Sequence, residues 1–231
     1  MTRRLELLDW AREASAFVIE DDYDSEFRYD GAPLLSLAGI DHLSRVIYVG
    51  TFAKTLFPGL RIGYCALPER LVRPVTTARA ALDRFPGTLM EGAVADMLNS
   101  GAFAANLRKV RGIYREARNA LASTLSAASD GRLSVPVPSQ GLHLVARFDP
   151  STDPLVATKA KTEAGVAGWL LAETYFRARP LPGFVLGFAG HPLPQLIASA
   201  ERLAKSSLAA LQASRNTKNG TGKVKRLKAA T

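Results

Sequence analysis

The sequence predicts an α/β fold, in which a β-sheet is buried between layers of helices, followed by a small α+β domain. Three observations lead to this prediction. Short apolar runs that suit strands alternate with longer segments whose apolar residues recur at helical spacing. The early strand candidates are apolar on both faces, as in sheets that helices cover on each side. The 231 residues are 47% hydrophobic and 22% charged, which is enough to form a sizeable core.

The first predicted domain covers residues 1–102. Helical spacing of apolar residues predicts three helices, over residues 3–14, 69–82 and 88–98. Apolar runs predict three strands, at residues 17–19, 45–49 and 62–67. Pro86 and Gly87 interrupt the helical pattern, because neither residue suits a helix interior.

The second predicted domain covers residues 103–213 and begins with a long helix over 103–125, where apolar residues recur at helical spacing. Further apolar runs predict three strands, at residues 133–135, 142–148 and 184–188. The segment 150–160 is expected to be a loop. Two more helices are expected, over residues 165–176 and 196–211.

Residues 214–231 are predicted to form a basic, disordered tail. The net charge of the chain is +9, and residues 215–231 contain six basic residues and no acidic one, with few large apolar side chains. Such a tail could bind nucleic acid loosely through phosphates, or could act only as a solubilising extension. Weak, salt-sensitive binding that is lost with the tail would support the first interpretation.

Other features narrow the class of protein. Acidic residues interrupt the N-terminal segment, so no secretory signal is expected, and the chain has no apolar run of about 18 residues that would predict a membrane-spanning helix. Cys65 is the only cysteine, which excludes an intrachain disulfide and fits a cytoplasmic location. We expect Cys65 to be a small buried residue.

Two segments that follow strands carry the polar residues of interest. The first is residues 20–29 (EDDYDSEFRY), and the second is residues 50–64 (GTFAKTLFPGLRIGY). Open α/β sheets bind ligands at the carboxyl ends of their strands. The carboxylates of the first segment could suggest a metal site, but no histidine or further carboxylate cluster accompanies them. We therefore do not expect a metal.

The side chains of these segments match the needs of a pyridine aldehyde that carries a phosphate. Its aldehyde requires a lysine amine, and Lys54 supplies one. Its ring nitrogen requires a carboxylate, which Asp21 supplies. Its phosphate suits the guanidinium of Arg61 and the hydroxyl of Thr51, and its phenolic oxygen suits the hydroxyl of Tyr23.

The two segments resemble the C-terminal aminotransferase-like domain of MocR-type regulators, a branch of the GntR family of bacterial transcription factors. They resemble class I/II aminotransferases more weakly. Ala53 departs from the regulators' pattern, which has serine before the lysine. The resemblance implies pyridoxal 5'-phosphate (PLP) as cofactor, with Lys54 on its aldehyde, Asp21 on its ring nitrogen and Tyr23 on its phenolic oxygen. It also implies that Arg61 and Thr51 hold the phosphate.

The resemblance also implies a partial fold-type I architecture, in which the three-layer large domain is incomplete and a small α+β domain follows. The segments that precede this region in the family have no counterpart here, so we expect an N-terminally truncated form. In the full-length family, a homodimer is expected, and DNA is bound only through a winged-helix domain that this chain lacks. The expected ligand is an amino acid or amine effector, and no membrane association is expected.

Besides nucleic-acid binding by the tail, two alternatives for the function of the chain stay open at this point. The chain could be a working class I/II aminotransferase that acts on an amino acid, or a non-catalytic truncated remnant. The aminotransferase hypothesis requires an arginine that binds the substrate carboxylate near the last predicted strand. The only candidates close to that strand are Arg177 and Arg179. His143 could contact a ligand or pack within its strand.

Overall fold

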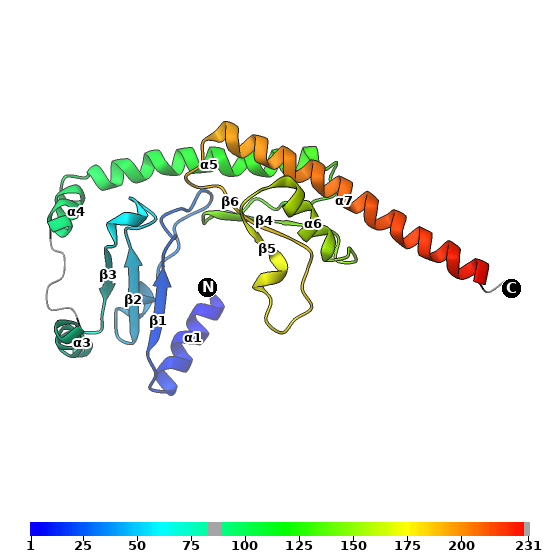
Figure 1. Cartoon of the computed structure of the whole chain (residues 1–231). Helices are drawn as coiled ribbons and strands as arrows, with labels where there is room; N and C mark the ends of the chain where they lie inside the picture. Colours follow the sequence, from blue (N-terminus) through cyan, green and yellow to red (C-terminus); the bar gives the residue numbers. More distant parts are fainter. Residues whose placement is uncertain (83–88, 229–231) are drawn as a thin grey trace. The chain divides into compact units, whose positions relative to one another are not determined.

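The computed structural model describes residues 1–82 and 89–228 and shows two compact units, Met1–Val110 and Arg111–Thr231 (Figure 1). The division falls inside the long helix α5, Ala102–Ala128. The interruption at Pro86 and Gly87 and the expected first residue of the following helix lie outside the described residues. No helix in the described ranges combines the length and the hydropathy needed to cross a membrane.

The first unit contains a three-stranded sheet of order β1-β2-β3. The strands and the short 3-10 helix η1 are β1 (Val18–Asp22), β2 (Val46–Thr51), η1 (Pro58–Leu60) and β3 (Gly63–Ala66). The helices before α5 are α1 (Thr2–Glu13), α2 (Leu37–Asp41), α3 (Glu69–Leu82) and α4 (Leu89–Asn99). The three strands and the three helices predicted for this part of the chain are confirmed, with shifted ends, whereas α2 and η1 were not predicted.

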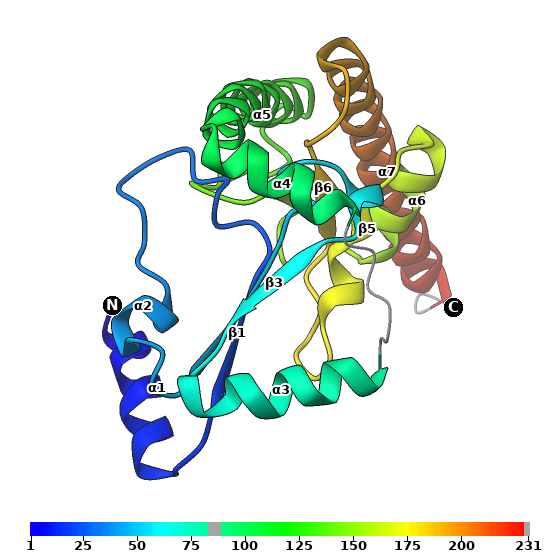
Figure 2. The ribbon, with the colours of Figure 1, turned by 90° about the vertical axis from the view of Figure 1, so that its left-hand side faces the viewer.

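The strands meet in a mixed arrangement that fixes which ends share an edge. β1 and β2 are parallel, and β3 runs antiparallel to β2. One face of the sheet packs against α1 and α2, which lie together on the same side of the strands in Figure 2, around the buried residues Leu8, Ala38 and Val46. Burial of these apolar side chains drives the helices onto the sheet.

The opposite face of the sheet carries exposed side chains on its two outer strands. Ile19 is 69% exposed, and Cys65 is exposed as well, so the expectation that Cys65 is buried was wrong. The register explains this result: Cys65 and Asp21 both pair with Val49, which places them on the face that α1 and α2 do not cover. Sequence alone cannot show which face of an outer strand a helix covers.

Two carboxylates tie α2 to the strands. Both carboxylate oxygens of Glu20, on β1, accept hydrogen bonds from the first backbone N–H groups of α2, at Leu37 (2.8 Å) and Ala38 (3.0 Å). Asp41, buried at the end of α2, accepts a hydrogen bond from the backbone N–H of Val46 at the start of β2 (3.0 Å). These contacts satisfy helix N–H groups that would otherwise lack partners and fix the path between β1 and β2.

The second unit contains an antiparallel sheet of order β4-β6-β5. Its elements after α5 are β4 (His143–Arg147), α6 (Leu155–Ala164), β5 (Trp169–Leu170), η2 (Leu171–Thr174), β6 (Gly183–Gly187) and α7 (Leu193–Lys228). Helices α6 and α7 pack together. The core includes Phe148 and Phe184, whose ring centroids lie 5.6 Å apart in an edge-to-face arrangement.

Three predictions for the second unit were wrong. The expected loop at 150–160 contains most of α6, whose buried face consists of Val156, Ala157, Ala160 and Ala164. The expected helix at 165–176 is β5 followed by η2, because Gly165 and Gly168 have φ values of 60° and 126° that a helix does not allow. The expected strand at 133–135 is a single bridge between Ser134 and Arg147.

The expected disordered tail also differs from the structure. The backbone of α7 continues as helix to Lys228 and includes most of the segment predicted to be disordered. Adding residues to an existing helix does not repeat the cost of nucleation, which a short isolated segment would have to meet. Composition alone therefore underestimated the helix here.

Candidate functional site

One edge of the first unit's sheet carries the predicted site residues. Strands β1 and β2 are parallel. Asp21 is the last residue but one of β1, and Thr51 is the last residue of β2. Gly63, the first residue of β3, pairs with Thr51, so the segment that precedes β3 begins at the same edge. Lys54 and Arg61 lie in this connection between β2 and β3. The strand pairing thus brings together segments that are 30 to 40 residues apart.

The turn that carries Lys54 is anchored by its neighbours. Thr55 is only 2% exposed, and its carbonyl oxygen accepts a hydrogen bond from the Asn106 side chain on α5 (3.4 Å). The backbone N–H of Leu56 donates to the carbonyl of Phe52 (2.9 Å). Lys54 itself is exposed, and its amine has no hydrogen bond or ion pair within the described part of the chain. A fixed backbone therefore presents an accessible amine.

A second set of hydrogen bonds joins this turn to the segment of Arg61. The Thr51 hydroxyl accepts a hydrogen bond from the N–H of Ala53 (3.1 Å) and donates to the carbonyl of Ile62 (3.4 Å). Arg61 is exposed and has a left-handed backbone, with φ of 55°. This conformation costs about 1–2 kcal/mol for a residue with a side chain. Backbone strain of this kind is concentrated at functional sites.

Tyr23 and Asp21 lie close enough to interact electrostatically. The negative charge of Asp24 raises the pKa of the Tyr23 hydroxyl, and burial, a hydrogen bond to Asp24 and the charge of Asp21 raise it further. Tyr23 therefore stays protonated over the neutral range and can donate a hydrogen bond. Asp21 is exposed at the edge of the sheet and is accessible to a ligand.

A cluster around Asp22 was not predicted from the sequence. The hydroxyl of Tyr48, on β2, donates a hydrogen bond to the Asp22 carboxylate (2.8 Å). The ring of Tyr64, on β3, lies 6.1 Å from that of Tyr48 and 5.3 Å from that of Phe52. Asp22, Gly50 and Tyr64 occupy paired positions on adjacent strands. The sequence feature that could have revealed this cluster is the alternation of side chains between the two faces of each strand. It becomes informative only once the strand register is known.

Gly50 is required by the close approach of Tyr64. A Cβ atom at this position would lie 2.4 Å from the Tyr64 ring. We expect Gly50→Ala to displace Tyr64 and to lower the free energy of unfolding by about 1–3 kcal/mol, because the ring has to leave its packed position. Urea denaturation measures this change. Gly59→Ala is the control, since its nearest contact would be an ordinary 3.6 Å, and an equal loss in both variants would contradict the interpretation.

The tyrosine pair predicts a late step in alkaline titration. Burial, followed by the hydrogen bond to Asp22, raises the pKa of Tyr48 well above its ordinary value of 10.0, and burial also raises the pKa of Tyr64. The folded state holds the protons of these two hydroxyls more tightly than the unfolded state does. The two protonated hydroxyls therefore contribute to the free energy of unfolding below pH 10, and this contribution is lost as the pH rises through the raised pKa values.

Tyrosinate absorbance, followed as the pH rises, tests this prediction. We expect Tyr48→Phe to remove a late component of the tyrosine titration, whereas Tyr175→Phe should leave that component in place. Retention of the late component in Tyr48→Phe would contradict the assignment.

The fold is that of the fold-type I aminotransferases, and it defines the class of protein. The chain covers about half the length of each such structure. Kynurenine aminotransferase from Pyrococcus horikoshii has a TM-score of 0.80 and 25% identity, with 91% of this chain and 52% of that chain covered. The multiple substrate aminotransferase from Thermococcus profundus has a TM-score of 0.78 and 27% identity, with the same coverage.

The chain belongs to the family Aminotransferase class I and II, whose profile matches residues 4–185. Among its relatives is the probable rhizopine catabolism regulatory protein MocR of Rhizobium meliloti, which is 36% identical over 82% of this chain and 38% of its own length. Another is the HTH-type pyridoxine biosynthesis transcriptional regulator PdxR of Corynebacterium glutamicum, which is 33% identical over 82% of this chain and 41% of its own length. The predicted resemblance to MocR-type regulators is confirmed, and the chain spans about two fifths of the length of these relatives.

Proposed function

We propose that the chain is the PLP-binding, effector-sensing part of a MocR/GntR-type regulator, and that Lys54 is the residue that carries the cofactor. The observation that carries this proposal is the exposed amine of Lys54, which has no partner among the described residues. It lies on an anchored turn at the same sheet edge as Asp21 and Arg61. The regulators among the relatives support the sensing role.

The side chains at this edge fit pyridoxal phosphate chemically. When bound, the cofactor supplies an aldehyde and an electron-accepting ring. The amine of Lys54 would hold the aldehyde, and the carboxylate of Asp21 would hold a proton on the ring nitrogen. The guanidinium of Arg61 would bind the phosphate through its planar fork, helped by the hydroxyl of Thr51.

Tyr23 has a further requirement. Its hydroxyl is engaged by the side chain of Asp24, so contact with the phenolic oxygen of the cofactor requires this hydrogen bond to be exchanged. Because the pKa of Tyr23 is raised, the hydroxyl keeps its proton and can donate a hydrogen bond to an anionic oxygen. Asp24 would then orient Tyr23 when the cofactor is absent.

We expect Arg61→Ala to weaken PLP binding by roughly 10- to 100-fold, because hydrogen bonds to charged groups are worth about 1.5–3 kcal/mol. Equilibrium dialysis against PLP measures the affinity. Arg108→Ala, at an exposed position on α5, is the matched control and should leave the affinity unchanged. Equal affinity in Arg61→Ala and the unmodified chain would remove Arg61 from the proposed site.

Sensing would consist of an amino acid or amine displacing Lys54 from the cofactor, which signals the presence of the ligand without turnover. In the whole regulator, DNA would be bound by a winged-helix domain, and two copies would form a homodimer. The test is to titrate the PLP-loaded chain with amino acids and amines while its visible absorbance and keto acid production are followed. A reversible spectral change without keto acid supports sensing.

A working aminotransferase is the second candidate, and the solved aminotransferases of the same fold favour it. It predicts catalytic formation of keto acid in the same titration. It also needs a cation for the substrate carboxylate, and the guanidinium of Arg177 lies instead 5.5 Å from the ring centroid of the exposed Phe176. Absence of any spectral change would support the remaining hypothesis, that the chain is a non-catalytic remnant.

A further inference from the structure

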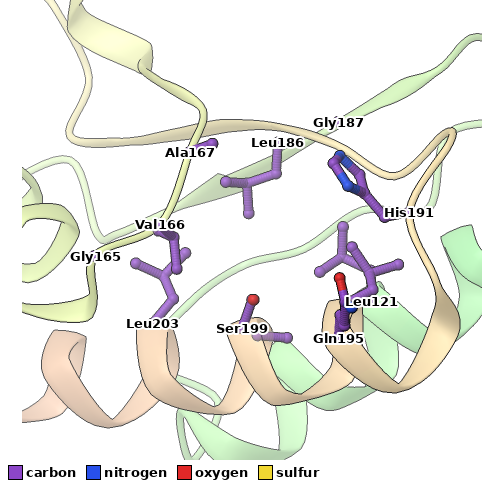
Figure 3. A pocket seen from close by; sticks show the side chains of 12 residues that line it. Leu121, Gly165, Val166, Ala167, Leu186, Gly187, His191, Gln195, Ser199 and Leu203 are labelled. Carbon is purple, nitrogen blue, oxygen red and sulfur yellow. The ribbon is translucent and has the colours of Figure 1, made fainter.

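A cavity of about 160 Å³ lies within the second unit, between α5, α7, β6 and the turn that follows α6 (Figure 3). Its floor is apolar and buried: Leu121, Leu186, Leu196 and Leu203 line it, and each is at most 7% exposed. A cavity of about 150 Å³ with such a lining accommodates benzene. The floor therefore has room for one phenyl ring or one branched aliphatic group.

The rim of the cavity is polar. Gln195 and Ser199 lie one turn apart on α7, and His191 lies on the segment that leads into this helix. Figure 3 shows the Gln195 and Ser199 side chains directed into the space above the helix, with the His191 ring across from them. His191 and Gln195 are exposed, so the rim opens to solvent. A ligand could thus bury an apolar group and keep a polar head at the rim.

The charge next to this rim is positive. One guanidinium nitrogen of Arg202 donates a hydrogen bond to the Ser199 hydroxyl (3.1 Å), and another donates to the carbonyl of Ala164 (3.4 Å). These two bonds hold the cation one turn from the cavity mouth. Among the described residues that line the cavity, none is acidic. The electrostatics therefore favour a ligand with an anionic head.

We infer that this cavity binds a small monocarboxylate that carries a branched aliphatic or phenyl group. The apolar group lies on the leucine floor, and the carboxylate accepts hydrogen bonds from Ser199 and Gln195 beside Arg202. For a ligand of this size, we expect a dissociation constant on the order of 0.1–1 mM. The cavity is formed by residues of the second unit alone, so its ligand does not depend on Lys54.

Methyl-resolved NMR of the full chain, labelled at leucine and valine, tests the inference with isovalerate as the probe. We expect saturable shifts at Leu186, Leu196, Leu203 and Val166. 3-Methylbutylamine should bind at least tenfold more weakly, because its cationic head meets Arg202. No shift with millimolar isovalerate in a chain with dispersed methyl signals, or equal binding of the amine, would overturn the inference.

Matched variants locate the ligand. Ala200→Leu fills the cavity and should abolish the shifts, whereas Ala198→Leu, at an exposed position of the same helix, should not. Val166→Phe is a second way to fill the cavity from its rim, should Ala200→Leu disturb the fold. Retained binding in a folded, filled variant would contradict the site.

The role of charge is tested separately. Arg202→Gln should weaken isovalerate at least tenfold, while Arg202→Lys should restore most of the affinity and Lys205→Gln should change nothing. Equal affinity in Arg202→Gln and the unmodified chain would overturn the carboxylate assignment. Lys54→Ala should keep the same affinity for isovalerate, which separates a failure of this inference from a failure of the PLP proposal.

Discussion

Replacing Lys54 with alanine should abolish the visible absorbance band that PLP produces on binding, together with its bleaching by borohydride. Both signals require a covalent link between a primary amine and the cofactor aldehyde, and alanine has no amine. The expected effect is complete loss rather than a partial decrease. Absorbance of the purified chain during titration with PLP measures it.

The same variant should fold as well as the unmodified chain. Lys54 is exposed, so its replacement should change the free energy of unfolding by no more than about 0.5 kcal/mol. Lys109→Ala, on an exposed position of α5, is the matched control and should keep the full absorbance band. A band of normal intensity in Lys54→Ala would show that another amine carries the cofactor.

Phe27→Ala should cause the largest loss of stability in the first unit, about 3–5 kcal/mol. Phe27 is fully buried and directly follows the acidic segment, residues 20–26. Its backbone N–H donates a hydrogen bond to the carbonyl of Asp24 in that segment (2.9 Å). Removal of a fully buried ring leaves a cavity, and its cost adds to the lost burial of the ring. Because whole domains are stable by only about 5–15 kcal/mol, PLP binding should weaken as the folded fraction falls.

Urea denaturation of Phe27→Ala, followed by circular dichroism, measures this loss. Leu34→Ala removes an apolar side chain from the same connection between β1 and β2, but Leu34 is 61% exposed. Its expected cost is therefore within about 0.5 kcal/mol. Similar losses in the two variants would show that the Phe27 ring does not anchor the acidic segment.

Much of the candidate site could be predicted because its residues follow strands. The apolar runs that became β1 and β2 placed Asp21 and Thr51 at strand ends, and the next residues supplied Lys54 and Arg61. Parallel pairing then places these ends at one edge. The motifs of the regulators gave each residue a role, and those roles remain proposals.

Other features depend on pairing that local sequence does not contain. The bond between Tyr48 and Asp22 joins residues on two strands whose register is set by the whole sheet. Helix α6 buries mainly alanines, which give a weak periodic signal. The exposure of Cys65 depends on which face of the sheet is covered. Each of these features was missed or wrongly predicted because tertiary structure overrides the local sequence pattern.

The central claim is that Lys54 carries the cofactor, and peptide mapping tests it most directly. The chain is incubated with PLP, reduced with borohydride, digested with trypsin and analysed by mass spectrometry. Modification of Lys54 prevents cleavage after it, so we predict the added mass of the reduced cofactor on the peptide of residues 46–61. Added mass on a different lysine, or none in a chain shown to be folded, would contradict the proposed site.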